Sequence, residues 1–67
     1  MNHTVTIQIS LNPIHVRATC HGEIVHDAPN TFDNLAVARY YAAGLHDGLA
    51  MHGIASVITA QRLAAVL

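Results

Sequence analysis

The stretch FDNLAVARYYAAGLHDGLAM, Phe32–Met51, decides the fold because no other part of the chain is long enough to cover a small sheet. Its apolar residues recur at steps of three and four, which places them on one side of a helix. They are Leu35, Ala38, Ala42, Leu45 and Leu49. We expect Asn30 or Thr31 to cap this helix. Asp33 would then lie in the first turn, where a negative charge suits the helix dipole, and Gly53 would form a left-handed C-terminal cap.

Residues 3–11 alternate between apolar and polar side chains, the pattern of a strand with one buried face. The residues on the apolar face are Val5, Ile7, Ile9 and Leu11. Asn12 and Pro13 form the next turn, because proline cannot donate to a sheet ladder. A second strand follows at Ile14–Thr19. It directs Ile14, Val16 and Ala18 inward and His15, Arg17 and Thr19 outward.

The hairpin between the second and third strands has two possible registers. In the one we favour, residues 20–22 form a three-residue loop with Gly22 in the left-handed conformation. The resulting pairs are Thr19 with Glu23, Ala18 with Ile24, Val16 with His26, and His15 with Asp27. Only His26 then joins the apolar face as a polar residue, and Glu23 and Asp27 flank Arg17 on the outer face. A two-residue turn would instead point Ile24 outward.

The segment Ile54–Thr59 is short and rich in β-branched residues, which favours a fourth strand. Residues 60–67 contain good helix formers, so the alternative is a second helix capped by Ser56. We predict a single small α+β domain over residues 1–67, with a small antiparallel sheet in the order β-β-β-α-β and the helix packed on one face. The other face of the sheet stays open and carries polar side chains.

The composition indicates a protein that needs a partner. Of the 67 residues, 52% are hydrophobic and 10% are charged, against roughly 25% charged residues in ordinary soluble domains. A chain this short covers only part of its apolar surface by folding. We therefore expect a two-fold homodimer, formed either through strand edges or through a groove on the helix.

The charge pattern bears on the class of partner and on location. The net charge is −1 and there is no lysine. The basic residues Arg17, Arg39 and Arg62 lie one to a segment, so we expect no nucleic acid as a partner. We expect no signal peptide and no membrane-spanning segment, and we predict a cytoplasmic protein. A single cysteine, Cys20, allows no internal disulfide.

Six histidines raise the question of a metal site. His46 and His52 are six residues apart in sequence, about 120° around a helix, which does not bring two ligands to one side. Cys20 and His21 are neighbours that point apart in an extended chain. A nucleophilic site would pair Cys20 with a histidine and Asp27, but nothing beyond residue type supports it. We expect no metal, no cofactor and no enzymatic activity.

Two glycines mark the helix as a candidate interaction element. Gly44 and Gly48 each cost a helix interior about 1 kcal/mol relative to alanine, and they form a shallow groove where another backbone could approach. That groove packs either on the protein's own sheet or on a partner. Tyr40 and Met51 fit a protein-binding face. The candidate interaction residues are Tyr40, Tyr41, Gly44, Asp47, Gly48 and Met51 on the helix, with His15 and Arg17 on the second strand.

The chain resembles two known groups of proteins. Three strands, a helix entered through Asn30–Leu35, and a final strand resemble the small antitoxin domain of the HicB type. The helix text Tyr40–Leu49, followed by Gly53 and Ile54, is similar in style to small phage-encoded accessory proteins, the group that includes anti-CRISPRs. The second resemblance implies a non-catalytic inhibitor from a phage or mobile element that modulates a host protein by steric occupation. The first implies a regulatory module that binds a small toxin.

Overall fold

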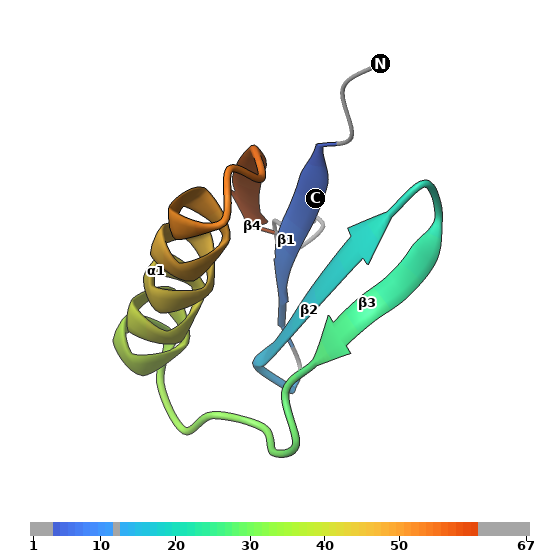
Figure 1. The fold of residues 1–67 in the computed structure, drawn as a ribbon. Coiled ribbons are helices and arrows are strands. Elements are labelled where there is room, and N and C mark those ends of the chain that lie inside the picture. Colours follow the sequence, from blue (N-terminus) through green and yellow to red (C-terminus); the bar gives the residue numbers. More distant parts are fainter. Residues whose placement is uncertain (1–3, 12, 61–67) are drawn as a thin grey trace.

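The computed structural model describes residues 4–11 and 13–60, and in these residues the chain folds as one helix on one face of a four-stranded sheet (Figure 1). The elements are β1 (Val5–Ser10), β2 (His15–Cys20), β3 (Glu23–Asp27), α1 (Leu35–Met51) and β4 (Ser56–Ala60). The predicted α+β class and element order are confirmed. Asn12 of the predicted first turn, and the part of the alternative second helix in residues 61–67, lie outside the described residues.

The sheet is mixed, which corrects the prediction of an entirely antiparallel one. Its strand order is β3-β2-β1-β4, and β4 pairs with β1 in parallel. The physical reason is the length of α1: its 17 residues span about 26 Å, enough to return the chain along the whole sheet before the last strand begins. The strand after the helix therefore runs in the same direction as β3 and β1.

The helix begins at Leu35, three residues later than the predicted start at Phe32. Asn34 is the N-cap: its backbone is extended, and its side chain accepts a hydrogen bond from the Val37 amide at 2.9 Å. The predicted caps Asn30 and Thr31 do not serve this role, and no acidic residue lies in the first turn, so Asp33 precedes the helix. The cause is the Phe32 amide, which donates to the Ile14 carbonyl at 2.8 Å and keeps this segment extended.

The predicted left-handed cap at the end of the helix is confirmed. Gly53 has a φ of +75° and its amide donates to the Ala50 carbonyl at 3.0 Å, while the Ile54 amide donates to Leu49 at 2.9 Å. These two bonds make a Schellman motif, which satisfies the last helical carbonyls and suits glycine at the left-handed position. The chain therefore reverses at once and enters β4, which decides the choice at Ile54–Thr59 in favour of a strand.

The β2–β3 hairpin adopts a two-residue turn instead of the predicted three-residue loop. His21 and Gly22 have φ values of 55° and 81°, the left-handed pair of a type I′ turn whose twist matches that of the strands. The observed pairs are Cys20 with Glu23, Thr19 with Ile24, Ala18 with His26, and Arg17 with Asp27, so the predicted register is wrong. A register shift between Ala18 and Thr19 leaves Val25 as the extra residue of a bulge.

The bulge explains why one part of that register prediction survives. It advances β3 by one residue, so that His26 faces inward opposite Ala18 and Asp27 lies outward opposite Arg17. Without it, the two-residue turn would place Asp27 against the fully buried Val16. Ile24, predicted to face inward, is instead 54% exposed. The bulge therefore keeps a carboxylate out of the core, where its burial would be costly.

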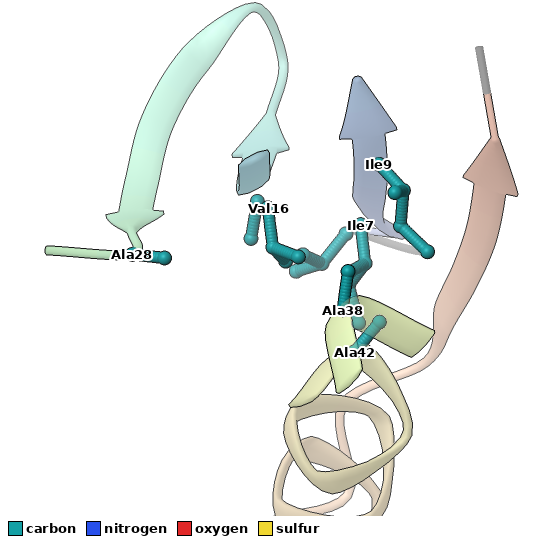
Figure 2. Close-up of a cluster of buried hydrophobic side chains, with 8 residues drawn as sticks. Ile7, Ile9, Val16, Ala28, Ala38 and Ala42 are labelled. Carbon is teal, nitrogen blue, oxygen red and sulfur yellow. The ribbon is translucent and has the colours of Figure 1, made fainter. Parts of the chain in front are cut away.

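The core lies between α1 and the central strands β1 and β2, and the helix also packs on β4. Its buried residues are Val5, Ile7, Ile9, Val16, Ala18, Ala28, Ala38 and Ala42. The close-up in Figure 2 shows Ala38 and Ala42 on the side of the helix that faces Ile7. Because the central helix residues are alanines, the helix backbone can lie close to the sheet, and the larger Leu35, Leu45 and Leu49 pack around it half-buried.

Candidate functional site

The solvent side of α1 carries an apolar face with little charge, which we call the outer helix face and define as Val37, Tyr40, Gly44, Gly48 and Met51. These residues recur at steps of three and four, so they share one side of the helix. Tyr40 is 83% exposed and Met51 is 86% exposed. These side chains lie away from the sheet of their own chain, because the core-facing side of the helix is occupied by Ala38 and Ala42.

The two glycines lie on this face with open space above them. A Cβ atom added to Gly44 or Gly48 would meet nothing within 4 Å beyond the helix's own backbone. The interpretation in which the groove packs on the protein's own sheet is therefore wrong. The fold itself requires a glycine at neither position, although each costs the helix about 1 kcal/mol relative to alanine. The space above them is available to another molecule.

The structure separates Tyr41 from the outer helix face. Its hydroxyl lies 2.7 Å from Nε2 of His26 on β3. Its ring is tilted against Phe32, with centroids 5.3 Å apart. Tyr41 is half-buried and ties the start of the helix to the β3 side of the sheet, so its place in the fold is structural. It was predicted as an interaction residue beside Tyr40, and the two tyrosines point to different surroundings.

His15 and Arg17 lie on the sheet face opposite the helix. Nε2 of His15 is 3.0 Å from the Ala28 carbonyl and 3.2 Å from the Asp27 carboxylate. Since both neighbours are acceptors, this nitrogen carries the proton. Arg17 Nε donates to the same carboxylate at 3.3 Å. The predicted association of Arg17 with Asp27 is therefore confirmed, whereas Glu23, which was predicted to flank Arg17 as well, pairs with Cys20.

A shallow polar hollow of about 210 Å³ lies on this open face, lined by Gln8, Ser10, His15 and Arg17. The helix packs on the other side of the same sheet, so the hollow and the outer helix face point in opposite directions. The structure thus divides the predicted interaction residues into two groups. Tyr40, Gly44, Gly48 and Met51 lie together, with the exposed Asp47 beside them, whereas His15 and Arg17 belong to a separate surface.

His15, His26 and His46 take part in hydrogen bonds of the protein. His46 on α1 places Nδ1 2.6 Å from the Ser56 hydroxyl and so links the helix to β4. His15 and His26 have the contacts given above. Within residues 4–11 and 13–60, no group of three or more histidine, cysteine or carboxylate side chains is arranged to hold a metal ion. No helix in this part of the chain is both long and apolar enough to cross a membrane.

The apolar side chains exposed on the outer strands were not predicted from the sequence. Ile24 and Val25 are exposed on β3, and Val57 and Ile58 on β4 are 48% and 43% exposed. The signal for β3 was the glycine after His21, which favours a two-residue turn and an outward Ile24. For β4 there was no signal, because an edge strand and a central strand share the same β-branched composition.

Comparison of the chain with models of protein families, with curated proteins and with solved structures finds no match.

Proposed function

We propose that this protein is a small non-catalytic binding module, of the kind that phages and mobile elements use to modulate a host protein by steric occupation. The observation that supports the proposal is the outer helix face. It exposes Tyr40 and Met51 almost completely and leaves two glycines uncovered in the middle of a helix. Tyrosine and methionine are enriched at protein interfaces, and glycines allow a partner's backbone to approach closely.

The mode of action follows from the position of this face. It lies on the rounded outer side of a helix, so the module acts by covering a site on its partner. Asp47 lies three residues after Gly44 and four before Met51, so it shares this side of the helix. Its carboxylate would orient the complex more than it would strengthen it. The expected partner presents an apolar groove that accepts a helix through residues at steps of three and four.

A second candidate is a HicB-type regulatory module that binds a small toxin. The observation in its favour is the element order β-β-β-α-β of the structure. Element order is a weaker argument than the exposed helix face, because one fold hosts many functions. The two candidates share a binding surface and differ in the partner.

Affinity capture from nuclease-treated bacterial lysate tests both candidates. The wild-type chain should retain one protein in stoichiometric amount, and the Tyr40→Ala/Met51→Ala variant should lose it, because those side chains supply most of the exposed apolar area of the face. The matched control is Ile24→Ala/Val25→Ala, which removes comparable exposed apolar groups from the hairpin.

Three outcomes of the capture are informative. Capture that depends on Tyr40 and Met51 and survives the hairpin variant supports the proposal. If both variants lose the captured protein equally, the capture reflects non-specific binding to exposed apolar surface, and the proposal is refuted. If the captured protein is a small toxin encoded beside this chain, the regulatory module is the correct candidate.

A further inference from the structure

In the described part of the chain, the outer edge of β4 is an open sheet edge without the features that normally protect one. There, β4 pairs only with β1. Its residues, Ser56–Ala60, include no charge, no proline and no bulge. The opposite edge is protected, since β3 carries Glu23, Asp27 and the bulge at Val25. Natural proteins protect exposed edges because an unpaired strand is a template for another strand.

The outward-pointing backbone amides and carbonyls of β4 are arranged so that two copies of the strand could pair antiparallel about a two-fold axis at Ile58. The Ala55 carbonyl accepts from the Val5 amide at 3.0 Å, so Ala55 and every second residue after it point toward β1. Ile58 and its alternate neighbours Ser56 and Ala60 therefore point their amides and carbonyls outward. In an antiparallel pair about Ile58, the two copies of Ile58 exchange both bonds, and Ser56 of each copy meets Ala60 of the other.

The helix lies close enough to the β4 edge to contact the helix of a second copy that is joined at this edge. It packs on β1 and β4 alike and less on β2. A helix axis midway between β1 and β4 lies about half a strand spacing inside β4. With strands roughly 4.8 Å apart, two copies joined at β4 would place their helix axes about 10 Å apart on the same side of the sheet. Packed helices are separated by about 8–10 Å. A two-fold axis perpendicular to the sheet makes the helices antiparallel.

The side of α1 that would meet its counterpart is made of small residues. His46 contacts Ser56 of β4 while Tyr41 contacts His26 of β3, which identifies the side of the helix nearest the β4 edge. Ala43 and Ala50 lie three and four residues from His46 and share that side. Ala36 lies one heptad before Ala43. All three alanines are exposed, and their small side chains allow two helices to approach closely.

The charges on this side are self-complementary. Arg39 and Asp47 each lie four residues from Ala43, in opposite directions along the helix. In an antiparallel pair centred on Ala43, Arg39 of each copy meets Asp47 of the other. The strand pairing gives nearly the same centre independently. Ile58 lies two residues, about 6.6 Å, beyond Ser56 along β4. Because α1 runs in the opposite direction to β4, the same distance along the helix leads about four residues back from His46. That position is within one turn of Ala43.

We propose that a second copy of this chain docks at the β4 edge, pairing Ser56–Ala60 antiparallel about Ile58 and packing the two helices through Ala36, Ala43 and Ala50, with reciprocal Arg39–Asp47 contacts. The result is one continuous eight-stranded sheet with both helices on one face. The outer helix faces remain uncovered and lie side by side, and Asp47 is the one residue that this dimer shares with the surface of the proposed function.

Sedimentation equilibrium at tens of micromolar tests the proposal. The wild type should have twice the mass of one chain. Arg39→Asp and Asp47→Arg should each weaken dimerisation by on the order of tenfold, because each replaces two attractive contacts by two repulsive ones. The charge-swapped double variant Arg39→Asp/Asp47→Arg should recover the wild-type affinity. These side chains are exposed, so the fold should survive each change.

Two further variants separate the edge from the helix groove. Ile58→Pro removes an outward amide that β1 does not use and should give a monomer, with circular dichroism confirming that it is folded. Gly48→Leu places a bulky group on the outer helix face and should leave the dimer intact. A monomeric wild type would overturn the proposal. So would a dimer that tolerates both single charge reversals, or one that Gly48→Leu abolishes.

Discussion

Truncation of Ile7 to alanine is the most direct test of the core. Ile7 is fully buried in the central strand β1, paired with Ala18 on one side and Ile58 on the other. The helix residues above it are Ala38 and Ala42, which have no long side chain that could move into a cavity. We therefore expect the Ile7→Ala truncation to lower the free energy of unfolding by about 3–5 kcal/mol, in the upper part of the range for such truncations in protein cores.

That cost is large for a chain of this length. A domain of 67 residues has a total free energy of unfolding of about 3–10 kcal/mol. Each kcal/mol lowers the melting temperature of such a small domain by about 4–8 °C. The Ile7→Ala variant should therefore melt at least about 12 °C below the wild type, or fail to fold at the growth temperature.

The assay is thermal unfolding followed by far-ultraviolet circular dichroism, with every variant at the same protein concentration because dimerisation would stabilise the fold by mass action. Ile7→Val should cost about 1 kcal/mol. The half-buried Leu45→Ala should cost less than Ile7→Ala. Ile24→Ala, at an exposed position, should change the free energy of unfolding by no more than about 0.5 kcal/mol. If Ile7→Ala melts no lower than Ile24→Ala, the core lies elsewhere and the assignment is refuted.

Local contacts and the histidines give three other predictions. Asn34→Ala should cost about 1 kcal/mol by removing the N-cap, whereas Asn30→Ala should be nearly neutral in the same melting assay; equal effects would contradict the observed helix start. Tyr41→Phe removes the hydroxyl that contacts His26 and should cost about 1 kcal/mol, with a similar loss in His26→Ala and no further loss in the double variant; additive losses would show that the two groups do not act together. Addition of a chelator should leave the melting temperature unchanged, and a large drop would reveal a structural metal.

Local patterning in the sequence predicted most of the core, although it placed the exposed Ile24 inside and did not include Ala28. The alternation through Val5, Ile7 and Ile9 set the buried face of β1, since side chains of a strand point to opposite faces in turn. The spacing of Ala38 and Ala42 set the buried side of α1 in the same way. Gly53 signalled the end of the helix, because a left-handed cap favours glycine by its backbone alone.

The candidate surface was only partly visible in the sequence. Helical spacing predicted a groove at Gly44 and Gly48 and placed Tyr40 and Met51 on the far side of the helix. The structure leaves open space above both glycines and exposes both of those side chains. The same spacing could not tell whether the glycines face the sheet or solvent, because they lie at the margin of the apolar side. Residues on other elements, such as Arg17, could be assigned to that face or another only once the layers were assembled.

Tertiary structure alone decided where segments distant in sequence meet. Phe32 pairs with Ile14 and delays the helix to Asn34, a choice that local capping propensity cannot make because several residues before the helix are good caps. The bulge at Val25 keeps Asp27 out of the core, and that requirement arises only when β2 and β3 are side by side. The parallel pairing of β4 with β1, which leaves one unprotected edge in the described part of the chain, follows from the path of the helix across the whole sheet.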